Sequence, residues 1–308
     1  MTSKVKRVVN VPVATVWTSF DSARAADSEA VSNPIMMERW LDSMNYEQRL
    51  ALCEENLVQT QALFGREVVV LDENESWVKV AVPDQPTGKD ERGYPGWMPK
   101  GQVAEVSEWN GKEGPIAIVS GRKSMLYATK PLMTLCFQTI LPVAETQGEW
   151  ISVKTPLGNG FLLAEDVDVY SGREEVPLGS GSDIVRAGEQ FLGLPYLWGG
   201  MSSYGYDCSG FSHTMCLANG RVIPRDASEQ ARSGMDVPLD ELEPGDLLFF
   251  AYEEGKGAVH HVGIYHGSGK MIHSPNTGKT VEIIGLEGTM YERELCVARR
   301  YWAEPEES

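Results

Sequence analysis

Residues 260–276, HHVGIYHGSGKMIHSPN, are the part of the sequence that most directly indicates a fold. They predict two short strands joined by a tight turn, because Gly267-Ser268-Gly269 separates two runs that contain Val, Ile and Tyr. Two helical patterns precede this hairpin, at 183–192 and from residue 207 onward, and further short strands surround it. Helices followed by closely spaced strands predict an α+β domain over residues 183–308.

The second helical pattern carries a cysteine at its start. Asp207 lies where an N-cap belongs, and Asn219-Gly220 supplies a C-terminal stop. Cys208 is therefore expected in the first turn, where unpaired N–H groups and the helix dipole favour the thiolate over the thiol. A nucleophilic cysteine needs such a position.

The hairpin supplies candidate partners for this thiol. If its turn is centred near Gly267-Ser268, His261 and His273 lie nearly opposite each other on adjacent strands, within roughly 4.5–5.5 Å between Cβ atoms. His260 and His266 differ from His261 by odd offsets and so point to the other face. This predicts a Cys–His–His site in which Cys208 attacks an amide carbonyl, His261 transfers the proton and His273 orients His261.

Two other interpretations of these residues stay open. The first is a buried structural cysteine with histidines satisfied inside the core. The second is a zinc site, but Cys208, His213 and Cys216 lack the paired spacing of structural zinc sites, and no H-E-x-x-H or C-x-x-C motif occurs. Cys53, Cys136, Cys216 and Cys296 are expected to be small core residues.

The N-terminal part contains two segments that resemble each other. Residues 68–82 with 96–103, and 140–155 with 158–167, each combine a strand, a polar turn, a second strand opened by Trp77 or Trp150, and an apolar bend. This pattern predicts two small half-open β barrels, the alternative being a chance likeness between two hairpins. A helical insertion is expected at about 33–64, with Asn33-Pro34 at a helix start and a capping box at Asn45 and Gln48. The predicted domains are 1–112, 113–172 and 183–308, with a linker at 173–182.

The composition excludes some partners. With 27 basic and 44 acidic residues, the net charge of −17 disfavours binding to nucleic acid or to an anionic membrane surface. Five cysteines at irregular spacing indicate a reducing compartment rather than a disulfide framework. The N-terminal residues lack the apolar run of a signal peptide, so we expect a cytoplasmic protein, or an exported one whose signal has been removed.

Five motifs resemble the NlpC-type, papain-like cell-wall peptidases in order and spacing. They are LPYLWGG (194–200), YDCSGF (206–211), PGDLLFF (244–250), HVGIY (261–265) and MIHS (271–274). The resemblance implies the triad Cys208, His261 and His273, in agreement with the strand argument. It also implies that the Tyr196 hydroxyl, with a backbone N–H near Cys208, binds the oxyanion.

With the two barrels, which resemble bacterial SH3-like domains, the chain is similar over nearly its full length to γ-D-glutamyl-L-diamino acid endopeptidases. In that family the first SH3-like domain closes one end of the cleft, which implies short murein peptides with a free N-terminal L-alanine as substrates. The implied substrate-binding residues are Tyr94, Trp198, Ser209 and Asp226, with Asp226 as counter-ion for the ammonium group. Gln59 departs from the family pattern, because it stands in an expected helix where related enzymes place a second acid.

The sequence thus predicts a papain-like α+β cysteine peptidase preceded by two SH3-like barrels, which hydrolyses the bond between γ-D-glutamate and a diamino acid. No metal or organic cofactor is needed, and a monomer is expected. Two alternatives remain: a secreted hydrolase that acts on intact wall, and a non-catalytic wall-binding protein. The sequence leaves open whether the diamino acid is meso-diaminopimelate or L-lysine.

Overall fold

The computed structural model describes residues 5–107, 109 and 114–303. These residues form two compact units, which are described separately. The first unit contains the chain up to Pro83, Arg92–Val176 and Met201–Tyr204, and the second contains Asp84–Glu91, Pro177–Gly200 and the chain from Gly205. The domain boundary predicted at residues 112 and 113 lies outside the described residues.

The first unit holds two seven-stranded sheets with the same topology. One has the order β3-β2-β6-β5-β4-β1-β7 and the other β10-β9-β13-β12-β11-β8-β14, so each strand of one sheet has an equivalent in the other. Trp77 and Trp150 open the equivalent strands β5 and β12, and the predicted repeat of two small β modules is confirmed. The strands are β1 Lys6–Val9, β2 Val13–Trp17, β3 Val58–Leu63, β4 Glu67–Glu73, β5 Trp77–Val82, β6 Tyr94–Pro99, β7 Val103–Val106, β8 Ile116–Val119, β9 Lys123–Tyr127, β10 Pro131–Cys136, β11 Ile140–Gln147, β12 Trp150–Thr155, β13 Gly158–Leu163 and β14 Val167–Tyr170.

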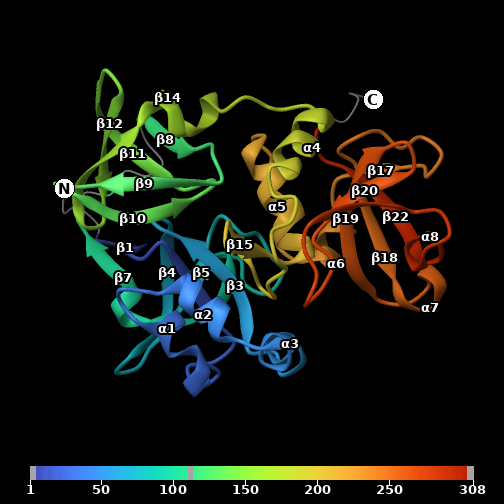
Figure 1. The fold of residues 1–308 in the computed structure, drawn as a ribbon, viewed down its shortest axis with the longest axis horizontal. Helices are drawn as coiled ribbons and strands as arrows, with labels where there is room; N and C mark the ends of the chain where they lie inside the picture. The colour runs from blue at the N-terminus through green and yellow to red at the C-terminus, as the bar shows by residue number, and fades with distance from the viewer. Residues whose placement is uncertain (1–4, 108, 110–113, 304–308) are drawn as a thin grey trace. The chain divides into compact units, whose positions relative to one another are not determined.

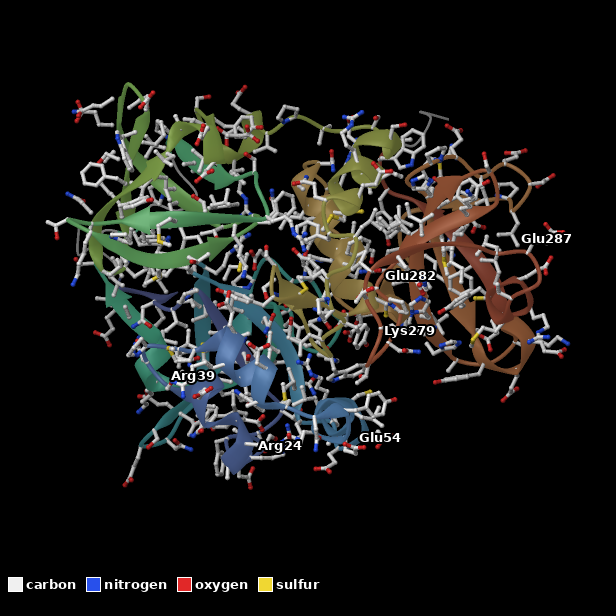
Figure 2. All side chains as sticks on the ribbon, viewed as in Figure 1. Arg24, Arg39, Glu54, Lys279, Glu282 and Glu287 are labelled. Carbon is white, nitrogen blue, oxygen red and sulfur yellow. The ribbon has the colours of Figure 1, made fainter. Side chains whose placement is uncertain are left out.

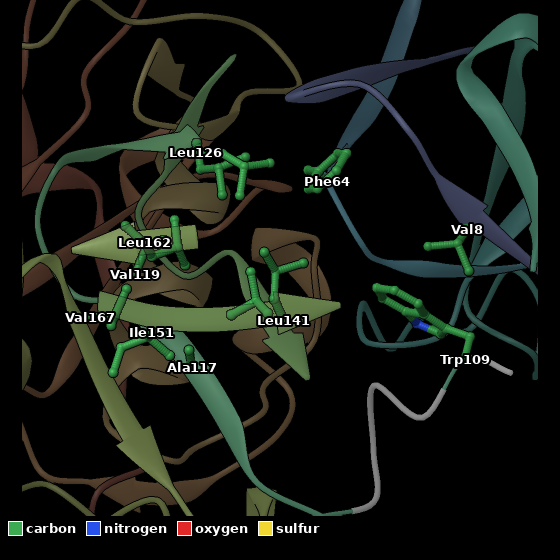
Figure 3. Packing of buried hydrophobic residues seen from close by; sticks show 12 residues of the cluster. Val8, Phe64, Trp109, Ala117, Val119, Leu126, Leu141, Ile151, Leu162 and Val167 are labelled. Atoms are coloured by element: carbon green, nitrogen blue, oxygen red, sulfur yellow. The ribbon is translucent and has the colours of Figure 1, made fainter. Parts of the chain in front are cut away.

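One hydrophobic cluster joins residues of both sheets. Phe64, next to β3, and Val8 of β1 belong to the same cluster as Leu141 and Ile151 of the second sheet (Figure 3). The backbone at Gly65 comes so close to the second sheet that a Cβ there would lie 2.8 Å from Leu141 Cδ2. The two modules therefore share buried apolar surface, which stabilises them together.

The segment between β2 and β4 corrects part of the sequence interpretation. Its helices are α1 Ser28–Val31, α2 Met37–Ser43 and α3 Tyr46–Glu54. Asn33-Pro34 does not begin a helix, because the Asn33 side chain donates to the carbonyl of Gly101 and α2 begins only at Met37. The capping box of Asn45 and Gln48 is confirmed. Residues 58–63 form strand β3, so the expectation that Gln59 lies in a helix is wrong.

The second unit is built on one antiparallel sheet with the order β17-β22-β18-β19-β20-β21. Helices α4 and α5 contact β19 and β20, and they lie along this sheet in Figure 1. Phe250, Met271 and Tyr291 belong to one of its buried clusters. This is the predicted α+β arrangement. Its elements are α4 Gly181–Glu189, β15 Met201–Ser202 (a short strand counted with the first unit), β16 Gly205–Tyr206, α5 Cys208–Ala218, α6 Ala227–Gln230, β17 Met235–Val237, β18 Leu247–Ala251, α7 Tyr252–Gly255, β19 Val259–Gly267, β20 Lys270–His273, β21 Glu282–Gly285, α8 Met290–Glu294 and β22 Leu295–Arg300.

Among the described residues, none of the helices has the length and apolarity needed to cross a bilayer.

Candidate active site

Cys208 is the first residue of helix α5, as the sequence predicts. Asp207 is the N-cap, and its Oδ1 accepts a hydrogen bond of 2.6 Å from the backbone N–H of Gly210. The helix ends at Ala218, and Gly220 follows with a positive φ of 73°. The thiol thus lies at a helix start whose N–H groups are only partly satisfied.

A buried ion pair holds the N-cap in place. Arg225 donates to both carboxylate oxygens of Asp207, at 3.1 and 2.6 Å, and to Ser209 Oγ at 2.8 Å. The Arg225 side chain is 1% exposed and that of Asp207 is 8% exposed. A bidentate pair gives each oxygen of a buried carboxylate a hydrogen bond and also neutralises its charge. Arg225 therefore fixes the start of the helix that carries Cys208.

His261 and His273 are brought together on neighbouring strands. His261 Nε2 and His273 Nδ1 lie 2.8 Å apart, and both side chains are buried. The predicted contact is confirmed, but the two residues are diagonal to each other rather than nearly opposite. The ladder pairs Ile264 with Ile272, which places His273 opposite Gly263 and diagonal to His261. A Cβ at Gly263 would lie at ordinary contact distance from His273 Cβ, 3.4 Å, but only 2.5 Å from Met271 Sδ, so the glycine makes room for Met271 beside the histidines.

The titration of these groups follows from their burial. Burial, with a smaller effect of the Asp207 carboxylate, raises the pKa of the Cys208 thiol to about 12. Burial and the neighbouring histidines hold the pKa of His261 well below its usual value. Burial, with a smaller effect of Lys279, lowers the pKa of His273 to about 3. Burial and the Asp207 carboxylate thus oppose the thiolate that the helix start was expected to favour.

Tyr291 completes the surroundings of the histidines, and no sequence pattern marks it. Its ring lies 5.4 Å from that of His261 and 5.1 Å from that of His273, measured between centroids. It is near enough to Cys208 for a thiolate there to contribute to the raised pKa of its hydroxyl, although burial is the larger cause. Tyr291 therefore covers both imidazoles on the side of α8.

Two more predicted site residues, Tyr196 and Trp198, lie in the second unit before α5. Tyr196 is buried, and its backbone N–H donates to the carbonyl of Lys279 at 2.9 Å. It also forms a parallel bridge with Tyr206, two residues before Cys208. Trp198 is half-buried. Their roles in binding oxyanion and substrate stay predictions.

Asp226 occupies the N-cap position of α6, but its side chain makes no capping hydrogen bond there. Its Oδ2 lies 2.9 Å from Lys89 Nζ instead. Lys89 belongs to the segment Asp84–Glu91 of the second unit, and no sequence pattern predicts that it lies beside Asp226. Asp226, which was predicted to bind the ammonium group of the substrate, thus already has the ammonium group of Lys89 beside it.

Tyr94 and Gln59 belong to the first unit. Tyr94 is buried at the start of β6, opposite Val82. Gln59 lies on β3 and donates from Nε2 to Thr18 Oγ1 and Asn56 Oδ1, at 2.8 and 3.0 Å. Their contribution to substrate binding stays a prediction.

The other histidines and cysteines take ordinary structural positions. His260 and His266 pair with Glu294 and Glu189, at 3.2 and 2.9 Å, and His213 is buried. None of the five cysteines, all of them described residues, forms a disulfide; Cys136 and Cys216 are core residues as predicted, whereas Cys53 and Cys296 are only half-buried. In the part of the chain that the structure describes, no group of three or more His, Cys, Asp or Glu side chains is placed to hold a metal ion.

Comparisons with known proteins agree with this geometry. Residues 193–300 match the NlpC/P60 family, and residues 119–170 match the YKFC SH3b2 domain. A γ-D-glutamyl-L-lysine dipeptidyl-peptidase of Bacillus subtilis (strain 168) is 46% identical over 294 residues, which are 95% of this chain and 97% of that protein. The chain belongs to the NlpC/P60 family.

Two further matches extend over most of this family member. A γ-D-glutamyl-L-lysine dipeptidyl-peptidase of Bacillus cereus (strain ATCC 10987 / NRS 248) is 40% identical over 96% of this chain and 91% of its own length. The crystal structure of an NlpC/P60 family protein from Bacillus cereus ATCC 10987 superposes with a TM-score of 0.94 at 40% identity, covering 97% of this chain and all of that one. The resemblance to cysteine peptidases with tandem SH3-like domains is confirmed, and the chain is a hydrolase of this class.

Proposed function

We propose that the protein hydrolyses the bond between γ-D-glutamate and a diamino acid in short murein peptides with a free N-terminal L-alanine. The observation that carries this proposal is the buried contact of 2.8 Å between His261 and His273, beside a helix that begins at Cys208. Support for the substrate comes from the full-length likeness to two proteins named γ-D-glutamyl-L-lysine dipeptidyl-peptidase.

The reaction follows from the resting protonation states. Because the thiol and the imidazole both start neutral, His261 takes the proton of Cys208 as the sulfur attacks the γ-carbonyl carbon. His273 occupies His261 Nε2, so Nδ1 is the nitrogen that exchanges this proton. The oxyanion is held by a backbone N–H at the start of α5 and by the Tyr196 hydroxyl. His261 then protonates the leaving amine, and water hydrolyses the thioester by the same route.

Recognition of the free amine is proposed for Asp226. A half-buried carboxylate favours an ammonium ion, and an acylated amine cannot form that charge-assisted bond. Lys89 holds this carboxylate at 2.9 Å, so the substrate amine has to displace the lysine or share Asp226 with it. Trp198, Ser209, Tyr94 and Gln59 are proposed as further substrate contacts.

The proposal is tested with the wild type and the Cys208→Ala variant. Both are incubated with L-Ala-γ-D-Glu-L-Lys, its meso-diaminopimelate counterpart and their N-acetylated forms, and products are identified by mass spectrometry. We expect thiol-dependent release of L-Ala-γ-D-Glu from the free-amine peptides only. Cleavage of the acetylated peptides, or of intact wall, favours the secreted hydrolase, and cleavage of nothing favours the wall-binding protein.

The compartment and the oligomeric state also stay proposals. We propose a cytoplasmic monomer, supported by the five free cysteines and the irregular spacing that suits a reducing compartment. Cell fractionation and light scattering of the purified chain test these two points.

A further inference from the structure

The outer nitrogen of the orienting histidine has no hydrogen-bond partner. His273 Nε2 is buried and makes no hydrogen bond to any described residue. The nearest charged acceptor is Glu282 Oε1, at 3.6 Å, just beyond hydrogen-bond length. We propose that Glu282 is a positioning residue that keeps the proton of His273 on Nε2 and so leaves the lone pair of His261 free for Cys208.

The backbone places Glu282 for this role. Strands β20 and β21 pair in antiparallel register, with His273 directly opposite Glu282. Side chains at directly opposite positions share one face of the sheet and interact across the ladder. The His273 side chain is fully buried and that of Glu282 is 40% exposed, so the carboxylate lies at the edge between the buried histidine pair and solvent.

The proposed effect follows from the tautomers of the two rings. A single hydrogen bond joins His261 Nε2 to His273 Nδ1, and only one of these nitrogens can donate. If His261 donates, its Nδ1 carries a lone pair that can accept the thiol proton. If His273 donates instead, His261 Nδ1 holds a proton and cannot act as the base.

The second, inactive arrangement leaves His273 Nε2 without a proton. A bare nitrogen lone pair would then face the Glu282 carboxylate, which also has only lone pairs to offer. The active arrangement points an N–H toward that carboxylate. Glu282 therefore favours the active tautomer, and by the same contact it stabilises the positive charge that His261 gains when it takes the proton from Cys208. Glu282 itself gains and loses no proton in this sequence.

The other groups around His273 do not replace this carboxylate. Lys279 is positively charged and lowers the pKa of His273, and Tyr291 presents its ring to both imidazoles. Figure 2 shows the Lys279 and Glu282 side chains near each other, while Glu287 lies well apart. A protonated imidazole would be repelled by Lys279, whereas Glu282, with Oε1 3.6 Å from His273 Nε2, lies close enough to attract it.

Three variants test the proposal, which rests on the proposed triad. Glu282→Ala removes the acceptor, Glu282→Gln keeps an amide oxygen without charge, and Glu287→Gln is the control at an exposed acid that lies apart from the histidines. We expect kcat for L-Ala-γ-D-Glu-L-Lys to fall about tenfold in Glu282→Ala and about threefold in Glu282→Gln, with KM changed less than twofold. The control stays at wild-type kcat. The effect is smaller than that of a buried orienting acid, because water can reach this partly exposed site.

A spectroscopic measurement separates positioning from a merely structural role. In ¹⁵N-histidine-labelled protein, the imidazole signals report which nitrogen of each ring holds the proton, whether or not a substrate is cleaved. We expect Nε2–H for both His261 and His273 in the wild type, and a mixture of tautomers in Glu282→Ala. Unchanged tautomers together with an unchanged kcat would overturn the proposal. If the wild type cleaves no peptide, the proposed function fails, while the tautomer measurement still decides the role of Glu282.

Discussion

Two ion pairs of the second unit have the same length but should differ greatly in what they stabilise. Arg225 and Asp207, and Arg186 and Asp183, each have an N···O distance of 2.6 Å. The first pair has side chains 1% and 8% exposed, whereas the second has side chains 72% and 38% exposed. Replacing either arginine by methionine removes a charge and keeps most of the side-chain volume.

The expected magnitudes follow from burial. Removing one partner of a buried pair costs about 3–5 kcal/mol, because the other charge stays desolvated and unpaired. An exposed pair contributes about 0–1 kcal/mol. In Arg225→Met the Asp207 carboxylate loses two charged donors and keeps the Gly210 N–H as cap donor, so the helix α5 opens more easily. At 1.4 kcal/mol per factor of ten, its opening equilibrium should rise about 100- to 4,000-fold.

Amide hydrogen exchange read by mass spectrometry measures this opening directly. Peptides covering 207–219 should lose protection by about two to three and a half decades in Arg225→Met, as about 3–5 kcal/mol requires. Peptides covering 181–189 should change by less than about tenfold in Arg186→Met. Far-UV circular dichroism confirms that both variants are folded. Protection of α5 that stays within about threefold of wild type in folded Arg225→Met would refute the reasoning.

Three further outcomes are expected. Burial lowers the pKa of His261, so its neutral form persists below the usual pKa range of histidine. The acid limb of the pH profile of kcat/KM should therefore lie below about pH 6.5. An acid limb above that pH would contradict a neutral base. Lys89→Met removes the ammonium group beside Asp226 and should lower KM for the free-amine peptide about twofold, while the acetylated peptide stays uncleaved, as initial rates show. Gly263→Ala puts a Cβ at 2.5 Å from Met271 Sδ, so Met271 has to repack beside the histidines. This should lower the free energy of unfolding in urea by about 1–3 kcal/mol and also lower kcat. A wild-type kcat would show that the hairpin accommodates the methyl group.

Local patterns in the sequence were sufficient to predict the parts of the site that lie on regular elements. Asp207 as N-cap and the start of α5 at Cys208 follow from helix signals, and the β19–β20 hairpin follows from its glycine-rich turn. Turn position alone did not fix the register to one residue. The observed pairing is shifted so that His261 meets His273 diagonally, past Gly263.

The errors in the first unit have a common cause. Asn33-Pro34 has the composition of a helix start, but the Asn33 side chain instead bonds to Gly101, which is distant in sequence. Residues 58–63 fall within the expected helical insertion, yet they pair with β2 as strand β3. In both places a tertiary contact overrides the local preference. The repeated β module was predicted correctly, because each copy of the strand pattern supports the assignment of the other.

The groups that tune the site could not be predicted, since their effects depend on desolvation and on neighbours distant along the chain. Arg225, Glu282 and Tyr291 belong to no local pattern with Cys208, yet each lies beside the triad or its supports. The N-cap illustrates why: the carboxylate that begins the helix also disfavours a thiolate next to it. Arg225 offsets part of that charge, but burial still raises the pKa of the thiol. In the proposed mechanism the nucleophile therefore forms at the moment of attack, when a base of the correct tautomer takes the thiol proton, rather than resting as a thiolate.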